Sequence, residues 1–258
     1  MNADNGDDLT DTQLERYARQ IVLRDVDLAG QARLLHARVL IVGMGGLGSP
    51  AALYLAGAGV GHLVLADHDA VDVSNLHRQV LHRSADIGRP KVESARDALL
   101  ALNPDITVTP IHARMTPTQL ADQVAQADVV LDCTDNFDTR FAINAACVAA
   151  RRPLVSGAAI RMEGQVSVFR TDVADAPCYR CLYREQGAQA EHCSRVGVIG
   201  PVVGVIGAMQ ALEALKLLAG FGTTLTGRLL LFDARTSQWR EVRLRRDPDC
   251  PACAGRSG

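Results

Sequence analysis

The residues with the clearest chemical spacing in this 258-residue chain are four cysteines arranged as two CxxC pairs. One pair is Cys178 and Cys181, and the other is Cys250 and Cys253. Four thiolates supplied by two such pairs form a closed tetrahedral zinc site, in which no coordination position remains for water. A redox pair and unrelated buried thiols are the alternatives. The spacing predicts a structural zinc that ties the C-terminus to the middle of the chain.

A second pattern, Gly43-Met44-Gly45-Gly46-Leu47-Gly48, matches G-x-G-x-x-G between an expected strand and an expected helix. Glycines let the backbone turn sharply and approach a ligand, while amide N–H groups at a helix start attract phosphate. Asp67 ends the next expected strand, where a carboxylate can accept hydrogen bonds from ribose hydroxyls. Tight strand–helix packing is the alternative role for the glycines. We predict nucleotide binding by Gly43, Gly45, Gly46, Gly48 and Asp67.

The polar connection that follows, residues 69–90, is longer than most loops that only join two elements, which indicates a function. This connection, together with Lys91 at the start of the next expected helix, carries groups suited to a triphosphate. Arg78 offers a rigid fork and Lys91 a point charge, and both suit the charge that moves during phosphoryl chemistry. Ser74 and Asn75 precede Arg78 in the same loop. Taken alone, such cations are more often solvated surface charges. We predict that all four side chains contact a bound nucleotide.

Asp135 and Asn136 follow a further expected strand, at the sheet edge where open α/β folds bind ligands. A carboxylate at that place can hold Mg²⁺ that bridges phosphates. The alternative for either residue is the N-cap of the next helix. We predict a magnesium site at Asp135, with Asn136 beside the nucleotide.

Cys193 differs from the paired cysteines because it has no partner at a metal-ligand spacing. It lies in the polar stretch 184–195, beside a histidine and an arginine whose positive charge favours a nucleophilic thiolate. A reactive thiol and an unreactive loop thiol remain equal alternatives. Cys133 and Cys147 lie in apolar strand and helix contexts, which predicts that both are buried in the core.

The elements that must position these residues alternate between strand and helix. Apolar runs predict strands at residues 38–42, 62–66, 106–111 and 128–131. Between them lie predicted helices at 47–58, 91–102 and 118–126, with another that ends near residue 150. Later strands at 154–156, 164–170, 229–233 and 239–244 have few helices between them. This order predicts a Rossmann-like α/β fold, with a mostly parallel sheet extended by antiparallel strands and helices on both faces.

The bulk properties place the chain among ordinary globular proteins. Residues 1–12 are predicted to be a mobile tail and residues 13–258 a single domain, because no linker composition interrupts them. A net charge of −2 does not indicate binding to nucleic acid or to an anionic membrane, since both would attract a basic protein. Seven cysteines without an export signal predict reduced thiols and a cytoplasmic location.

Residues 201–220 are long and apolar enough to need a membrane check. Gln210, Glu213 and Lys216 interrupt the second half of this stretch. A helix that is apolar nearly all round at first and amphipathic later is typical of a buried core helix. We therefore predict no membrane span here.

The ordered set of motifs resembles the ThiF/MoeB/HesA family, the bacterial branch related to ubiquitin-activating enzymes. The resemblance runs from about Arg16 to Cys253 and rests on RYARQIVL, GMGGLGSP, ADHDAVDVSNLHRQ, GRPKVESA, LDCTDN, PCYRC, GVIGPVVGVIGAMQALEALK and CPAC. It implies ATP-dependent adenylation of the C-terminal Gly-Gly carboxylate of a small ubiquitin-like sulfur-carrier protein. It also implies a homodimer and a sulfur donor that acts downstream.

The resemblance also assigns roles to individual residues. It places phosphate at Gly46, ribose at Asp67, phosphate contacts at Asn75, Arg78 and Lys91, and Mg²⁺ at Asp135. It further implies that Arg19 reaches into the partner subunit's site and that Cys193 acts in sulfur transfer. The chemistry agrees with these residue types, because an ionised carboxylate attacks phosphorus without a general base and needs mainly alignment and charge neutralisation.

The pathway is harder to read from the motifs. Residues 229–246 and 49–67 look more like thiazole-pathway members, while 156–165 and 91–100 look more like molybdopterin-pathway members. We lean towards the carrier of thiamine (thiazole) biosynthesis, with the molybdopterin-synthase small subunit as the alternative. An NAD-dependent oxidoreductase and a non-catalytic carrier-binding scaffold are the competing classes.

Overall fold

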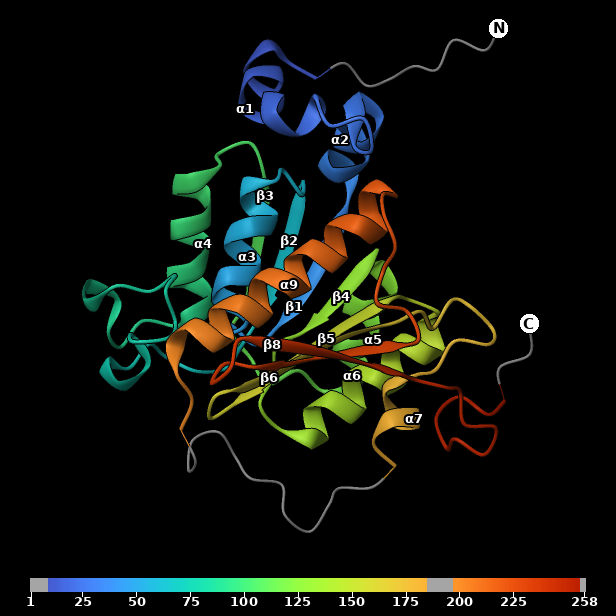
Figure 1. Ribbon diagram of the computed structural model, residues 1–258. Helices are drawn as coiled ribbons and strands as arrows, with labels where there is room; N and C mark the ends of the chain where they lie inside the picture. The colour runs from blue at the N-terminus through green and yellow to red at the C-terminus, as the bar shows by residue number, and fades with distance from the viewer. Residues whose placement is uncertain (1–8, 185–196, 256–258) are drawn as a thin grey trace, which may run out of the picture.

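An eight-stranded sheet forms the centre of the protein in a computed structural model, which describes residues 9–184 and 197–255 (Figure 1). The strand order is β3-β2-β1-β4-β5-β6-β7-β8. Strands β3 to β5 in that order are parallel, and β6, β7 and β8 continue the sheet antiparallel. The strands are β1 (Arg38–Val42), β2 (His62–Ala66), β3 (Thr107–Ile111), β4 (Val129–Asp132), β5 (Leu154–Ile160), β6 (Glu163–Phe169), β7 (Arg228–Asp233) and β8 (Gln238–Arg243). The predicted mixed α/β sheet is confirmed.

Helices cover both faces of the sheet, as its apolar runs require. On one face α2 (Asp27–His36), α3 (Gly48–Gly57), α4 (Lys91–Leu102) and α9 (Gly200–Ala219) pack on alternate strand residues. On the other face lie α5 (Pro117–Gln126), α6 (Phe137–Ala150) and the one-turn helix α7 (Tyr179–Leu182). The long connection 69–90 holds two short 3₁₀ helices, η1 (Val73–Asn75) and η2 (Ser84–Asp86).

Strand β5 is longer than the sequence indicates. The expected strand covered residues 154–156, but the ladder continues to Ile160 and pairs with Glu163 across a tight turn. Gly157, Ala158 and Ala159 have low strand propensity, so they carry no sequence signal for a strand. A side chain at Gly157 would overlap the buried Gln210 of α9, which explains the small residue there.

Helix α9 has the length and apolar character that a membrane span would need, and half of it is buried inside the fold. It crosses one face of the sheet in Figure 1. The buried amide of Gln210 donates to the carbonyl oxygens of Asp132, at 2.8 Å, and Val155, at 3.3 Å. These polar bonds to the strands below identify α9 as a core helix, as predicted.

Helix α1 (Asp11–Ile21) lies with α2 at the end of the sheet where the parallel strands begin (Figure 1). It begins inside the stretch predicted as a tail, because Thr10 and Gln13 form a capping box. Tyr17 of α1 is buried, and its hydroxyl accepts a hydrogen bond from Asn103 Nδ2 at 2.8 Å. This contact fixes α1 to the end of α4.

Candidate active site

A cleft of about 790 Å³ opens at the carboxyl ends of the parallel strands, where the sequence predicted a nucleotide. It brings together residues from segments that lie far apart in the chain. The sequence-predicted residues that line it are Gly43, Gly45, Gly46, Asp67, Asn75, Arg78, Lys91, Asp135 and Asn136. Gly48 and Ser74 are not part of the lining.

The glycine loop joins β1 to α3 with a geometry that requires glycine at its ends. Gly43 has a φ of +94°, and a Cβ there would lie 2.7 Å from the carbonyl oxygen of Cys133. A Cβ on Gly48 would lie 1.9 Å from the carbonyl oxygen of Gly43. Gly48 therefore allows the loop to close on itself, which is the packing role that the sequence left open as an alternative.

Asp67 organises the loops around the cleft. Its Oδ2 accepts a hydrogen bond from the Met44 N–H at 2.7 Å, and its Oδ1 accepts one from the Asp69 N–H at 2.8 Å. The carboxylate thus holds the glycine loop on one side and the start of the long connection on the other. Its predicted bond to a ribose stays a prediction.

Lys91 is almost completely buried, with 6% of its side chain exposed, and its Nζ lies 2.8 Å from Asp69 Oδ2. Burial raises the pKa of Asp69, but Lys91 and the neighbouring His68 and Arg114 outweigh it and hold that pKa below its usual value. Asp69, His68 and Arg114 also line the cleft. The sequence analysis did not predict these three residues. The one signal for them was that Asp69 lies two residues after Asp67, and that spacing alone does not indicate a site.

Arg78 is oriented by its own loop. Its Nη1 donates to the carbonyl oxygen of Ser74 at 2.9 Å and lies 2.8 Å from His77 Nε2. Asp72 accepts hydrogen bonds from the backbone N–H of Ser74 at 2.8 Å and from its hydroxyl. Ser74 therefore contributes to the cleft indirectly, because its carbonyl oxygen orients the guanidinium of Arg78.

Asn136 has the N-cap role that the sequence offered as an alternative, because its Oδ1 accepts a hydrogen bond from the Thr139 N–H at 2.9 Å. Asp135 is exposed at the cleft and makes no ion pair among the described residues. Its carboxylate is accordingly available to a cation. Arg140, which sequence reasoning missed, is buried behind this turn and donates to the carbonyl oxygens of Thr134 and Gly157.

Two predicted site residues remain, Arg19 and Cys193, of which the structure describes only Arg19. Arg19 is exposed on α1, which packs at the opposite end of the sheet, so it does not line the cleft of its own chain. Arg16, on the same helix, lies 3.5 Å from Asp105 and donates to the Leu102 carbonyl oxygen. Cys193 falls in the segment 185–196, outside the described residues.

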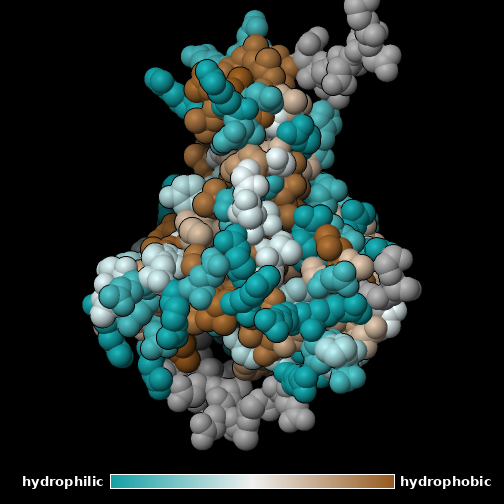
Figure 2. Space-filling model, turned by 45° about the vertical axis from the view of Figure 1, so that its right-hand side comes forward, coloured by the Kyte–Doolittle hydropathy of each residue, from teal (hydrophilic) through white to brown (hydrophobic). Residues whose placement is uncertain are grey.

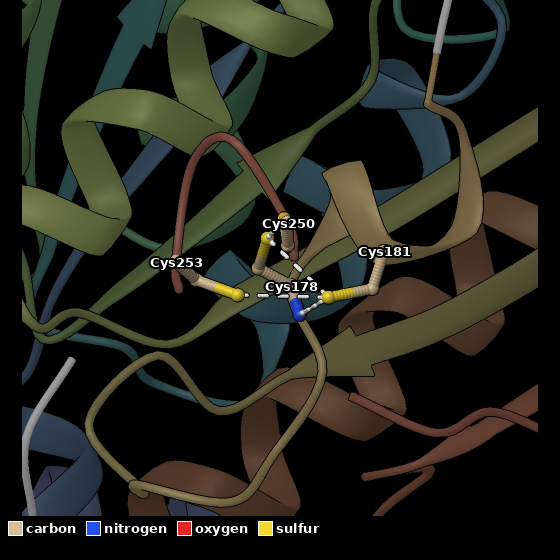
Figure 3. Close-up of side chains that lie close together, drawn as sticks. All are labelled: Cys178, Cys181, Cys250 and Cys253. Carbon is tan, nitrogen blue, oxygen red and sulfur yellow. Dashed lines mark hydrogen bonds between the residues drawn. The ribbon is translucent and has the colours of Figure 1, made fainter. Parts of the chain in front are cut away.

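The four paired cysteines come together as the spacing predicted (Figure 3). Their sulfur atoms all lie within 4.8 Å of one another, and three of the four residues are buried. The Sγ–Sγ distances are 3.6 Å for Cys178–Cys250, 3.5 Å for Cys181–Cys253 and 3.9 Å for Cys178–Cys181. A zinc ion with Zn–S bonds of about 2.3 Å needs sulfurs roughly 3.8 Å apart, so the thiols are placed to bind a metal ion.

Hydrogen bonds from backbone amides to Cys181 favour the thiolate form that a metal needs. The Sγ of Cys181 accepts hydrogen bonds from the backbone N–H groups of Cys178, at 3.4 Å, and Asp247, at 3.5 Å. The Cys178 thiol and these amides hold the pKa of Cys181 below its usual value. In contrast, burial raises the pKa of Cys133 and Cys147, which are inert core thiols as predicted.

A model of the ThiF family matches residues 17–252. This chain belongs to the ThiF family. It is 53% identical over 246 residues to the molybdopterin-synthase adenylyltransferase of Escherichia coli, covering 95% of this chain and 98% of that protein. It is also 53% identical over 247 residues to the sulfur carrier protein ThiS adenylyltransferase of E. coli, covering 96% and 98%.

The fold of this ThiF-family protein is also found in solved structures. The crystal structure of E. coli MccB with ATP superposes with a TM-score of 0.78 at 25% sequence identity. The match covers 88% of this chain and 70% of that chain. The solved structure therefore shares the fold, while the family assignment rests on the family model and the two relatives.

Proposed function

We propose that this protein uses ATP to adenylate the C-terminal Gly-Gly carboxylate of a small ubiquitin-like sulfur-carrier protein. The observation that carries the proposal is the cleft, which is lined by Arg78, Lys91, the glycine loop and an exposed Asp135. Attack on the α-phosphorus brings two anions together, so the reaction needs positive charge and alignment more than a proton acceptor. The names of the two relatives describe the same reaction class.

A second cleft supports a peptide substrate. Its volume is about 490 Å³, and it shares Asp135, Asn136, Ala159 and Arg140 with the first cleft. It extends over the antiparallel strands to Trp239. An extended chain end lying there would bring its carboxylate to the nucleotide, and glycines fit such an approach because they lack side chains.

Two metal ions complete the proposal. Asp135 would hold Mg²⁺, whose charge would neutralise the triphosphate and the departing pyrophosphate. The cysteine cluster would hold a structural Zn²⁺, which its sulfur spacing fits. Four thiolates leave no open position, so this second metal takes no part in the chemistry.

We further propose that the protein works as a cytoplasmic homodimer. Figure 2 shows hydrophobic side chains exposed at the top of the molecule, over α1 and the loop before α2. Val22 is 73% exposed, Leu23 55% and Leu28 53%, and such a patch is typical of an interaction surface. Because Arg19 lies in the same region and far from its own cleft, a second copy could receive it. The sulfur donor and any role of Cys193 belong to the step after adenylation.

The carrier is proposed to be that of the thiazole (thiamine) pathway, with the small subunit of molybdopterin synthase as the second candidate. The two relatives named for these pathways are each 53% identical to this chain. The choice therefore rests on the segments 229–246 and 49–67, which look more like thiazole-pathway proteins.

The test is ATP–pyrophosphate exchange with Mg²⁺ and a panel of purified carriers that end in Gly-Gly. Exchange with one carrier, lost when its last glycine is deleted, would establish the reaction and identify the pathway. Tight ATP binding without exchange on any carrier would favour the scaffold class. NAD binding without ATP binding would favour an oxidoreductase and refute the proposal.

A further inference from the structure

A buried histidine, which the proposed function does not use, lies behind the glycine loop. His82 is 6% exposed. Its Nε2 lies 3.1 Å from the carbonyl oxygen of Met44, and its Nδ1 lies 2.9 Å from the hydroxyl of Ser94. Both ring nitrogens are therefore engaged by segments far apart in the sequence.

The protonation of the ring follows from its partners. A carbonyl oxygen can only accept, so Nε2 must carry hydrogen and donate to Met44. Burial lowers the pKa of His82 and outweighs the hydrogen bond to Met44, which raises it, and the Lys91 ammonium lowers it further. The neutral ring donates through Nε2, so the lone pair of its Nδ1 faces the Ser94 hydroxyl, which the Asp86 carboxylate also hydrogen-bonds.

The two partners of His82 belong to the two phosphate-binding segments of the cleft. Met44 lies inside the glycine loop, and its N–H is held by Asp67 at 2.7 Å. Ser94 lies on α4, three residues after Lys91 and so on the same face of the helix. The imidazole thus bridges the glycine loop and the helix that carries Lys91.

We propose that His82 is a positioning residue for ATP, fixing the glycine loop relative to Lys91 by donating from Nε2 to Met44. The inference rests on the proposed function, because it assumes that this loop and Lys91 hold the phosphates together. Asp67 restrains the Met44 N–H, but only His82 restrains its carbonyl oxygen among the described residues.

The expected consequence is weaker ATP binding with little change in the chemical step. The loop would hold phosphates both before and during attack, so losing its restraint removes binding that is common to both states. KM for ATP should rise and kcat should stay nearly constant. A merely structural role would instead lower the amount of active enzyme, and with it the apparent kcat.

The test compares His82→Asn with His82→Gln. The glutamine amide nitrogen reaches the place of Nε2 and can still donate to Met44, whereas the shorter asparagine reaches only the Nδ1 side. We expect Kd and KM for ATP to rise about tenfold in His82→Asn and to recover to within about threefold in His82→Gln. His36→Asn, at an exposed position of α2, is the control and should leave both constants unchanged.

Melting curves confirm that each variant is folded before binding is measured. If His82→Asn does not fold, Ser94→Ala tests the same bridge, with an expected rise of about threefold in Kd for ATP. An unchanged Kd in the folded variant, equal losses in Asn and Gln, or a fall in kcat alone would overturn the proposal. ATP binding needs no carrier, so the Kd comparison decides the role of His82 even if exchange fails and the carrier proposal with it.

Discussion

Lys91 and Asp135 show how the environment of single residues prepares the cleft for phosphates. Lys91 is buried, and its ion pair with Asp69 holds the ammonium group in one place. A phosphate that binds Lys91 would have to compete with the Asp69 carboxylate. Asp135 is exposed and makes no ion pair among the described residues. A buried, positioned cation and an open carboxylate are the two kinds of group that a magnesium–nucleotide complex requires.

Replacement of Asp135 by alanine separates a magnesium role from a structural one. We expect Asp135→Ala to lower carrier-dependent pyrophosphate exchange by at least about a hundredfold, because charge neutralisation at the phosphates would be lost. Its melting temperature should stay within about 2 °C of wild type, since the side chain is exposed. Asp122→Ala, at an exposed position of α5, should have neither effect. Near-normal exchange by Asp135→Ala would remove Asp135 from the proposed mechanism.

At the scale of elements, Gly45 and Gly48 of the glycine loop differ in why glycine is needed at each position. A Cβ on Gly45 would meet its nearest neighbour, Gln79 Nε2, at 3.6 Å, which is an ordinary contact. A Cβ on Gly48 would overlap the carbonyl oxygen of Gly43. The fold therefore needs glycine at position 48, while only a closely approaching ligand would need it at position 45.

Alanine at these two positions should produce opposite results. Gly45→Ala should keep the melting temperature within about 2 °C of wild type, yet weaken ATP binding by about tenfold, because the new methyl group would occupy the place proposed for the phosphates. Gly48→Ala should lower the free energy of unfolding by about 3 kcal/mol or more through backbone displacement. Equal ATP affinity in Gly45→Ala and wild type would argue against phosphate at this loop. Denaturant melts and equilibrium ATP binding measure the two effects.

For the molecule as a whole, the cysteine cluster joins segments that are 72 residues apart in the chain. We expect removal of bound zinc by a chelator to lower the melting temperature by about 5 °C or more, because metal binding contributes folding free energy. Metal analysis before and after chelation is the control, and re-addition of Zn²⁺ should restore the melt. A melt that is unchanged after confirmed loss of zinc would contradict a structural role.

The proposed homodimer predicts complementation between two inactive variants. If Arg19 acts in the partner's cleft, Arg19→Ala and Asp135→Ala are each inactive, but a mixed dimer contains one intact site. Random mixing after subunit exchange should then restore about a quarter of wild-type exchange activity, since half of the dimers are mixed and each has one working site. No recovery, with subunit exchange verified, would mean that Arg19 does not act in trans.

The sequence by itself determined most of the fold and nine of the residues that line the cleft. The buried strands 38–42 and 62–66 and the glycine pattern between them are local signals, because apolar runs and positive φ angles are set by neighbouring residues. The CxxC spacing likewise predicted the cysteine cluster, since two short knuckles supply a tetrahedral set whatever lies between them.

Only the tertiary structure decided which distant side chains act together. Nothing local in the sequence connects His82 with Met44 and Ser94, or Arg140 with the carbonyl oxygen of Gly157 on β5. The second half of strand β5 was also not predicted from the sequence, because its glycine and alanines form a strand only where β6 pairs with them and α9 covers them. Burial and hydrogen bonds between segments create these arrangements, and they exist only once the chain has folded.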